Sequence, residues 1–385
     1  MPKQKQSAKQ VQPSVEVPAP IPVPDQRPKP INLPMLDLYS DYLTCSFGLT
    51  TATGMSTVLD GAVGHDDITR FLSEREYTNK DLWKLVKPTI RQIETDDGVL
   101  VLDDTIEEKP YTDENDIIAW HYDHVFNRQV KGVNILNALY HNDQGDIPLG
   151  FAIVKKDIHF TDPGTGKPKR RSSVTKNEQA RELIGTTARN QVKFRYVLAD
   201  SWFSSQENME FVVAKKKHFI FALKSNRTFA ESREDKLKGK FQPVESLVWE
   251  ENTTKTGYLK GMAMPVQITR QVFTNEDGSR GVLYLATSDL TLGYSGITTI
   301  YQKRWKVEEY HKSTKSNLGL AKSPTKKVVT QSNHFFAVAY AYHKLDRLAR
   351  GTSLNHFALK AKLYAKALQA SMAELQRLKT VGDFA

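Results

Sequence analysis

The 385-residue sequence predicts an α/β fold in which alternating strands and helices lie between two helical regions. Short apolar runs in the middle of the chain, such as GVLVLDD at 98–104, are typical of strands buried on both faces. Before residue 95 and after residue 297, apolar residues instead recur with the period of an amphipathic helix. The presence of both periods in one chain predicts the mixed class.

The first 95 residues divide into two regions. Residues 1–33 are rich in Lys, Gln, Pro and Val, a composition that favours a disordered tail. Residues 34–95 form several short helices, broken near Gly61 and Gly64, and are compatible with a helix-turn-helix module. Because residues 35–98 hold 6 basic and 11 acidic side chains, this domain is either a DNA reader or a helical bundle for another interaction.

The central strands and helices follow a definite order. After the strand at 98–104, the runs at 132–141 and 146–155 are joined by NDQG and predict a hairpin. A helix at 174–190, the strand FRYVLAD at 194–200, a helix capped near Ser204 or Ser205, and a strand at 218–225 then follow. Three strands, helix, strand, helix, strand is the order of ribonuclease-H-like nuclease cores, so residues 96–225 are interpreted as the first part of such a core by fold-level analogy.

The rest of the chain completes this core. Residues 226–296 alternate strand-like runs with turns such as NEDG and hold no long helix, which predicts a β-rich insertion. Residues 297–350 return to a helical pattern and are interpreted as the second part of the core. Residues 351–385 form a C-terminal helical region, with dimerisation as its suggested role.

The composition points to a partner and a compartment. Lys and Arg number 54 against 44 Asp and Glu, which gives a net charge of +10 and favours a polyanion, most often nucleic acid. The single cysteine, Cys45, excludes an intramolecular disulfide and fits a reducing cytosol. No apolar run approaches the roughly 20 residues that span a bilayer, so we expect a cytoplasmic protein without a membrane partner.

Acidic side chains end two of the predicted strands. Asp103 and Asp104 close the first strand, and Asp200 closes FRYVLAD. The carboxyl ends of strands in open α/β sheets are where sites collect, although an aspartate there is also a common turn or cap residue. A third acid, Glu308, lies in the helical segment YQKRWKVEEYHKSTK at 301–315.

The charged segment arranges its side chains in a stripe. On one continuous helix, Tyr301, Arg304, Glu308 and Lys315 fall within about 60° of one another, beside an apolar stripe that includes Val307. An ordinary surface of i, i+4 ion pairs is the alternative interpretation. The position of Glu308 at the edge of the core favours a site.

Three acids in a basic protein suggest a metal site. Carboxylate oxygens suit Mg²⁺ or Mn²⁺, and two such ions about 4 Å apart activate a water or a 3′-hydroxyl for attack on a phosphodiester. We therefore expect Asp104, Asp200 and Glu308 to converge on two ions. His121 and His124 are interpreted as loop or DNA-contact residues rather than metal ligands.

The segment at 301–315 resembles a known family, the DDE transposases of bacterial insertion sequences. Tyr301, Arg304, Glu308 and Lys315 reproduce without a gap the Tyr-x2-Arg-x3-Glu-x6-Lys spacing of its cut-and-paste branch. The resemblance covers roughly residues 95–350 and includes a β-rich insertion before the glutamate.

The resemblance also assigns the two aspartates. In the family the first aspartate precedes a threonine, which selects Asp104 of DDT over Asp103, and the second ends a strand, as Asp200 does in LADSWF. It implies that Asp104, Asp200 and Glu308 are catalytic and hold the two metal ions.

The same resemblance implies a DNA transposase that binds inverted terminal repeats, acts as a homodimer on double-stranded DNA, and cleaves and joins strands, in related members through a hairpin. Tyr301, Arg304 and Lys315 would then contact the terminal phosphate. An aromatic side chain of the insertion stacks on a flipped base in the family; Trp249 is a candidate for it, with hairpin packing as the alternative role.

Basic side chains gather where this interpretation places DNA. Residues 155–195 hold 11 basic and 4 acidic side chains, including KPKRR at 167–171, and residues 299–350 hold 11 basic and 3 acidic ones. Two alternatives remain: a two-metal nuclease or resolvase that cuts without joining, and a domesticated DNA-binding regulator without chemistry.

Overall fold

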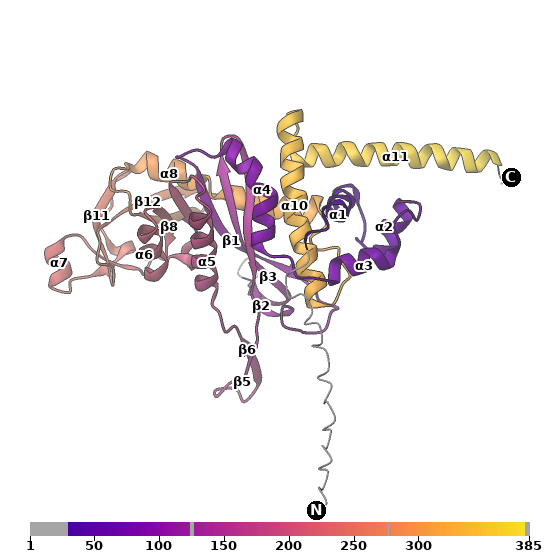
Figure 1. Cartoon of the computed structure of the whole chain (residues 1–385). Helices are drawn as coiled ribbons and strands as arrows, with labels where there is room; N and C mark the ends of the chain where they lie inside the picture. Colours follow the sequence, from indigo (N-terminus) through magenta and orange to yellow (C-terminus); the bar gives the residue numbers. More distant parts are fainter. Residues whose placement is uncertain (1–29, 124–126, 276, 382–385) are drawn as a thin grey trace, which may run out of the picture. The chain divides into compact units, whose positions relative to one another are not determined.

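The computed structural model describes residues 30–123, 127–275 and 277–381. Its strands are β1 (Val99–Glu108), β2 (Ala119–Asp123), β3 (Arg128–Asn142), β4 (Gly145–Ile153), β5 (Ile158–Thr161), β6 (Pro168–Arg171), β7 (Tyr196–Ala199), β8 (His218–Leu223), β9 (Thr228–Ala230), β10 (Gln242–Pro243), β11 (Thr254–Leu259), β12 (Val266–Thr274) and β13 (Arg280–Thr287). The predicted α/β class is confirmed (Figure 1).

The helices lie before, between and after the strands. They are α1 (Leu33–Cys45), α2 (Ala52–Val58), α3 (His65–Ser73), α4 (Asn79–Ile93), α5 (Lys176–Arg189), α6 (Gln206–Ala214), α7 (Arg233–Leu237), α8 (Tyr294–Gln302), α9 (Trp305–Asn317), α10 (Val328–Thr352) and α11 (His356–Val381), with 3-10 turns η1 (Ser201–Phe203) and η2 (Val244–Ser246). Most of the predicted tail, residues 1–29, lies outside the described residues. None of the helices described has the length and apolarity needed to cross a bilayer.

All the described strands except β5 and β6 belong to one mixed sheet. Its order is β10-β9-β11-β12-β13-β8-β7-β1-β3-β2, and β4 also pairs with β3. The predicted hairpin is present as β3 and β4, with β3 antiparallel to β1 as well. Strand β7 pairs parallel to β1, with Val101 opposite Leu198, and β8 pairs parallel to β7. Strand β7 ends at Ala199, beside the middle of β1, which continues to Glu108. The prediction that Asp103 and Asp104 close the first strand is therefore wrong: both lie within β1, because its pairing with β3 continues beyond them.

The segment at 226–296 extends this sheet. Strand β13 pairs antiparallel to β8, and β12, β11 and β9 follow in turn. The segment is rich in strands, and α7, with five residues, is the longest of its described helices. Its strands thus continue the central sheet outward from the parallel strands.

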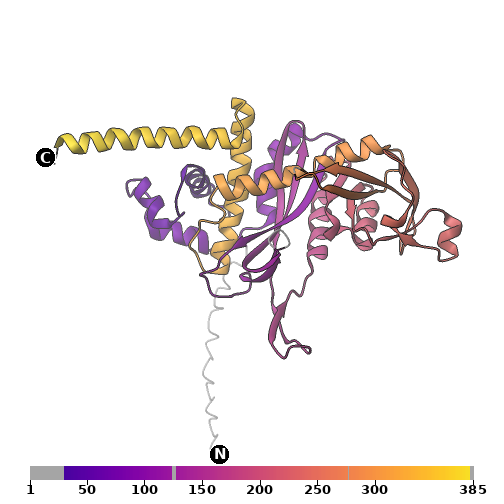
Figure 2. The same cartoon turned by 180° about the vertical axis from the view of Figure 1, so that it is seen from behind.

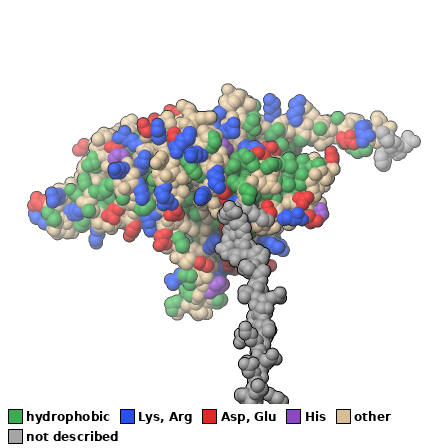
Figure 3. All heavy atoms as spheres, viewed as in Figure 1, with side chains coloured by type: hydrophobic (Ala, Val, Ile, Leu, Met, Phe, Trp, Pro, Cys, Tyr) green, Lys and Arg blue, Asp and Glu red, His purple; other side chains and the backbone are tan. Residues whose placement is uncertain are grey.

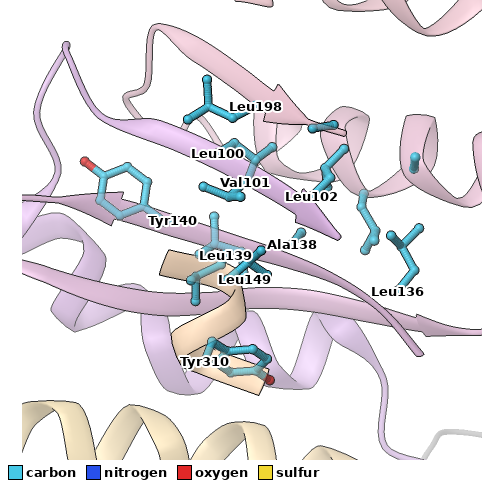
Figure 4. Close-up of a cluster of buried hydrophobic side chains, with 14 of the residues drawn as sticks. Leu100, Val101, Leu102, Leu136, Ala138, Leu139, Tyr140, Leu149, Leu198 and Tyr310 are labelled. Atoms are coloured by element: carbon cyan, nitrogen blue, oxygen red, sulfur yellow. The ribbon is translucent and has the colours of Figure 1, made fainter. Parts of the chain in front are cut away.

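A continuous apolar core holds the sheet. Figure 4 shows Leu100, Leu102, Leu139 and Leu198 from neighbouring strands packed together, with Tyr310 of α9 approaching from one side. These four leucines are at most 1% exposed. Because burying a leucine contributes about 1.5–3 kcal/mol, this packing fixes β1 and β7 against each other.

Helix α10 joins the N-terminal helices to the core. It packs against α1, α3, α4 and β4, and its middle is buried over several turns. Two buried polar side chains make the connection: Asn333 donates to the carbonyl of Leu72 at 2.9 Å, and His334 lies 3.0 Å from the hydroxyl of Tyr39. The N-terminal helices consequently belong to the same compact unit as the sheet, Ile31–Ala385.

Two further segments matter for the site. Figure 2 shows α8 and α9 (orange) running along the sheet toward α10, and α9 contacts β1, β3 and α10. Strands β5 and β6 form a separate two-stranded hairpin that projects from the sheet (Figures 1 and 2). Neither β2 nor this hairpin is predicted by the sequence pattern.

We predict that the buried ring of His334 makes the fold sensitive to acid. Burial lowers the pKa of His334 from 6.5 to about 4. Between these two pH values the His334 ring binds a proton in the unfolded chain but not in the folded chain. The folded state therefore loses stability as the pH falls from about 6.5 toward 4. The loss from this one group is about 2 kcal/mol at pH 5.

Urea unfolding of His334→Gln at pH 7 and pH 5 measures this effect. The variant is expected to be less stable at pH 7 but to lose about 2 kcal/mol less than the wild type on acidification. His65→Gln, which changes an exposed histidine of α3, is the matched control and should keep the wild-type pH dependence. Equal pH dependence in His334→Gln and wild type would contradict the assignment.

Candidate active site

A cleft of about 790 Å³ opens where β7 ends beside the middle of β1, next to α9. Five of the residues singled out in the sequence line it, from three separate parts of the chain: Asp104, Asp200, Arg304, Glu308 and Lys315. The sheet supplies the two aspartates through the parallel pairing of their strands, and α9 supplies the glutamate.

Asp104 is held by two side chains. Lys176 Nζ lies 3.0 Å from each of its carboxylate oxygens, and Asn134 Nδ2 donates to Oδ2 at 2.7 Å. Lys176 is the first residue of α5, whose N-terminus is fixed by a capping box between Thr175 and Glu178. The capped start of α5 thus holds the Lys176 ammonium beside the Asp104 carboxylate of β1.

Asp103 points into the same cleft and has a different partner. Its Oδ2 accepts from Arg304 at 3.3 Å. Burial raises the pKa of Asp103 to about 7, against the opposing effect of Arg304, and the charges of Asp200 and Asp104 raise it further. Two neighbouring aspartates of one strand therefore stand in different electrostatic environments.

Asp200 begins the 3-10 turn η1. Its Oδ1 accepts the backbone N–H of Trp202 at 2.9 Å, as an N-cap residue does. Burial raises the pKa of Asp200, and the charge of Asp104 adds to the effect. Asp200 thus caps the turn, as expected for an aspartate that follows a strand, and it also lines the cleft.

The prediction of one continuous helix through the charged segment is wrong. Helix α8 ends at Gln302 and α9 begins at Trp305, with Arg304 as its N-cap. The backbone N–H groups of Lys303 and Arg304 donate to carbonyls three residues back, at 3.1 and 2.9 Å. The chain winds more tightly there than an α-helix, so the angles calculated for one ideal helix do not apply across residues 303 and 304.

Of the four residues, Tyr301 is not part of the cleft lining, although the guanidinium of Arg304 lies 6.0 Å from the centre of its ring. Tyr301 is 8% exposed, and its hydroxyl donates to the carbonyl of Ala199, the last residue of β7, at 3.4 Å. It lies behind the cleft rather than on its lining. Arg304 instead reaches Glu308 and Asp103, and so connects α9 to β1.

The floor of the cleft is polar and buried. Lys315 Nζ donates to the carbonyl of Ile106 at 2.9 Å. Asn137 Nδ2 donates to His311 Nε2 at 3.0 Å, and burial lowers the pKa of His311 to about 3. His311 is therefore neutral and accepts a hydrogen bond from β3, which anchors α9 over the sheet.

Comparison with known families agrees with this arrangement. A family model described as DDE superfamily endonuclease matches residues 23–240, more than half of the chain. The chain belongs to the DDE superfamily. A second model, described as Transposase DDE domain, matches residues 162–343. Together the matched ranges include Asp104, Asp200 and Glu308, and they support a transposase-type DNA cleavage function; none of the curated proteins compared with the chain matches it.

The carboxylate oxygens in the cleft of this DDE chain are ligands of the type that hard divalent cations bind. Its cleft is lined by five carboxylates and six Lys or Arg side chains. Among residues 30–123, 127–275 and 277–381, however, no three acidic, histidine or cysteine side chains lie close enough together to hold one ion. Lys176 pairs with Asp104 and Arg304 with Glu308 instead, and burial, followed by the charge of Asp104, raises the pKa of Asp200. Oxygen donors of this kind suit Mg²⁺ or Mn²⁺.

Two residues of the cleft of this DDE chain were missed in the sequence. Trp202 is 48% exposed, and its ring lies 4.9 Å from Lys176 Nζ and 5.5 Å from Lys224 Nζ. Its place two residues after Asp200, in LADSWF, is the signal that could have found it. Lys176 carried no such signal, because its partner Asp104 is 72 residues away.

Other residues differ from their expected roles in the DDE chain. His121 lies on β2 rather than in a loop, is 6% exposed, and lines the cleft; burial lowers its pKa to about 4. His124 is outside the described residues. Trp249 packs near Tyr284 and donates from its indole to the carbonyl of Val244 at 2.9 Å, in agreement with the packing role.

Replacing Lys176 tests how far the acids depend on protein cations. Lys176→Met is expected to lower the free energy of unfolding by about 1–3 kcal/mol, because a partly buried carboxylate loses its charged partner. Combining it with Asp104→Asn should cost less than the sum of the two single changes, by about 1 kcal/mol or more. Denaturant unfolding measures all three variants.

Exposed Lys193→Met serves as the matched control and should leave stability within about 0.5 kcal/mol of the wild type. Strict additivity of Lys176→Met and Asp104→Asn would contradict the pairing.

Proposed function

We propose that this protein is a DNA transposase that binds inverted terminal repeats and catalyses metal-dependent cleavage and strand transfer. It would act in cut-and-paste transposition, as the Tyr-x2-Arg-x3-Glu-x6-Lys spacing suggests, with a hairpin on the transposon end as one route. The observation that carries the proposal is the lining of a single cleft by Asp104, Asp200 and Glu308 together with Arg304 and Lys315.

The three acids are the proposed metal ligands. Asp104, Asp200 and Glu308 would hold two Mg²⁺ or Mn²⁺ ions, which when bound activate the attacking oxygen and stabilise the leaving one. The cations that now neutralise the acids would be released for DNA phosphates: Lys176 from Asp104, and Arg304 from Glu308. Arg304 offers a planar fork for a phosphate, and Lys315 a compact charge.

Tyr301 acts in this proposal from behind the cleft. Its hydroxyl bond to the carbonyl of Ala199 holds the end of α8 against the strand that precedes Asp200. Tyr301 therefore positions Arg304 and the second aspartate, and its effect on the terminal phosphate is indirect.

The core is proposed to be ribonuclease-H-like. The order β4-β3-β1-β7-β8 supports this, because β1, β3 and β4 are antiparallel neighbours while β7 and β8 run parallel to β1. Helices α5 and α6 lie between these strands in the chain, as the predicted element order requires.

The synaptic form is proposed to be a homodimer on double-stranded DNA, with α11 as the contact between copies. Exposed apolar side chains recur along α11 every three or four residues: Tyr364, Leu368, Met372, Leu375 and Leu378. This spacing suits a helix-to-helix seam. Leu368→Glu with Leu375→Glu should shift the protein to monomer in analytical ultracentrifugation; an unchanged distribution would exclude α11 as the contact.

Substitution of the acids tests the proposed chemistry. Asp104→Asn, Asp200→Asn and Glu308→Gln should each lower Mg²⁺-dependent cleavage of a duplex carrying the element's own ends by at least about a thousandfold, because each removes several kcal/mol of transition-state stabilisation. DNA affinity measured without metal should stay within a few-fold. Cleavage is followed by gel electrophoresis of end-labelled DNA.

A neighbouring acid is the matched control. Glu309→Gln, next to Glu308 and half exposed, should retain cleavage within about tenfold. Full activity in any variant of the three proposed ligands would refute the assignment. Cleavage without strand-transfer products would favour a two-metal nuclease, and specific binding without cleavage in any divalent ion would favour a DNA-binding regulator.

A further inference from the structure

A second cleft lies beside the active site, between β2 and the projecting β5–β6 hairpin. Its volume is about 810 Å³, and its lining includes Trp120 of β2, Phe160 and Lys169 of the hairpin, and the connecting Lys156. In Figure 3 hydrophobic, basic and histidine side chains occur together on the projection that the hairpin forms below the main body. We refer to this space as the hairpin cleft.

The hairpin cleft adjoins the active-site cleft. Lys156 and Arg170 line both of them. Lys156 is tied to β2 by a bond from its ammonium to the carbonyl of Trp120, and Arg170 Nε donates to the carbonyl of Lys156 at 2.9 Å. A linear ligand that occupies both clefts would therefore contact Lys156 and Arg170 where the two clefts meet.

The hairpin is anchored at its base. Besides its bond to Lys156, Arg170 donates to the carbonyl of Asn115 at 2.9 Å and approaches Glu114 at 3.4 Å. Ser173 donates its backbone N–H to Asp157 at 2.8 Å. The lining described holds one acid, Glu114, against Lys156, Lys169 and Arg170; Glu114 pairs with Arg170, and Lys169 pairs with Asp162 just outside the lining, so the hairpin cleft keeps a net positive charge.

Exposed aromatic rings face this region. Along β2, Ala119 and His121 are buried, whereas Trp120 is 50% and Tyr122 43% exposed. Across the cleft Phe160 is 37% exposed, and the guanidinium of Arg171 lies 5.6 Å from the centre of its ring. Large rings left in solvent beside cations are not needed by the core, and they match the stacking platforms of proteins that bind unpaired nucleic acid.

We propose that the hairpin cleft binds a single DNA strand whose bases are unpaired and which continues into the active-site cleft. The bases stack on Trp120 and Phe160, and the phosphates lie near Lys156 and Lys169. A duplex does not present base faces to these rings, so the aromatic lining favours a separated strand over intact double-stranded DNA. The inference rests on the proposed DNA substrate and adds the state of the strand next to the cleavage site.

Binding measured without catalysis tests the proposal. The full chain carrying Glu308→Gln is titrated in EDTA at fixed salt against two fluorescent probes, a 20-nucleotide oligo(dT) and a blunt 20-base-pair duplex. Adding Trp120→Ala or Phe160→Ala should weaken oligo(dT) binding about tenfold and duplex binding less than twofold. Trp120→Tyr keeps an aromatic face and should restore most of the affinity.

Phe273→Ala removes an equally exposed ring from β12, outside the lining of both clefts, and should change neither affinity. A photo-crosslink from oligonucleotides carrying 5-iodouracil to the unaltered chain provides evidence that no folding defect can affect; it should map to β2 or to the β5–β6 hairpin. Crosslinks elsewhere, or equal losses on both probes, would overturn the proposal.

The proposed strand path and the proposed transposase chemistry can be rejected independently of each other. Normal Mg²⁺-dependent cleavage by the Glu308→Gln variant, together with unchanged oligo(dT) binding when Trp120→Ala is added, would reject the strand path and the role of Glu308. The proposed roles of Asp104 and Asp200 would stand. Absence of cleavage by the wild type, together with the expected selective loss in Trp120→Ala, would reject the transposase chemistry and support the strand path.

Discussion

The parallel pairing of β7 with β1 is the constraint on which the site depends. With Val101 opposite Leu198, the end of β7 lies beside the middle of β1, and acids distant in sequence reach one cleft. Apolar packing on both faces of these strands stabilises the pairing, so the position of the acids is supported by the hydrophobic core. Helix α9 then brings Glu308 to the same place, held by the contact of Arg304 with Asp103.

Charge balance is the second constraint on the cleft. Buried carboxylates must be compensated, and here Lys176 and Arg304 do so from the start of α5 and the start of α9. The same cations are therefore available to exchange carboxylate for phosphate. A cleft lined by six Lys or Arg side chains suits a polyanionic substrate better than a small neutral one.

The sequence predicted the parts of this structure that depend on local pattern. The buried run of β1, the β3–β4 hairpin and Asp200 at the end of β7 were all predicted from short stretches, whereas the continuation of β1 past Asp104 to Glu108 depends on its pairing with β3 and was missed. The break between α8 and α9 was not predicted, because neither glycine nor proline marks residues 303 and 304. Lys176 and the hairpin cleft were also missed, since they depend on contacts between distant segments and on short polar strands whose pattern is weak.

Iron-directed cleavage of the polypeptide tests most directly whether the three acids share a metal site. When Fe²⁺ replaces Mg²⁺ in the presence of ascorbate and peroxide, hydroxyl radicals cut the backbone close to the bound ion. The account predicts cuts near residues 104, 200 and 308, suppressed by excess Mg²⁺ and by Asp200→Asn. Cuts confined to one of these positions, or found elsewhere and insensitive to Mg²⁺, would contradict it.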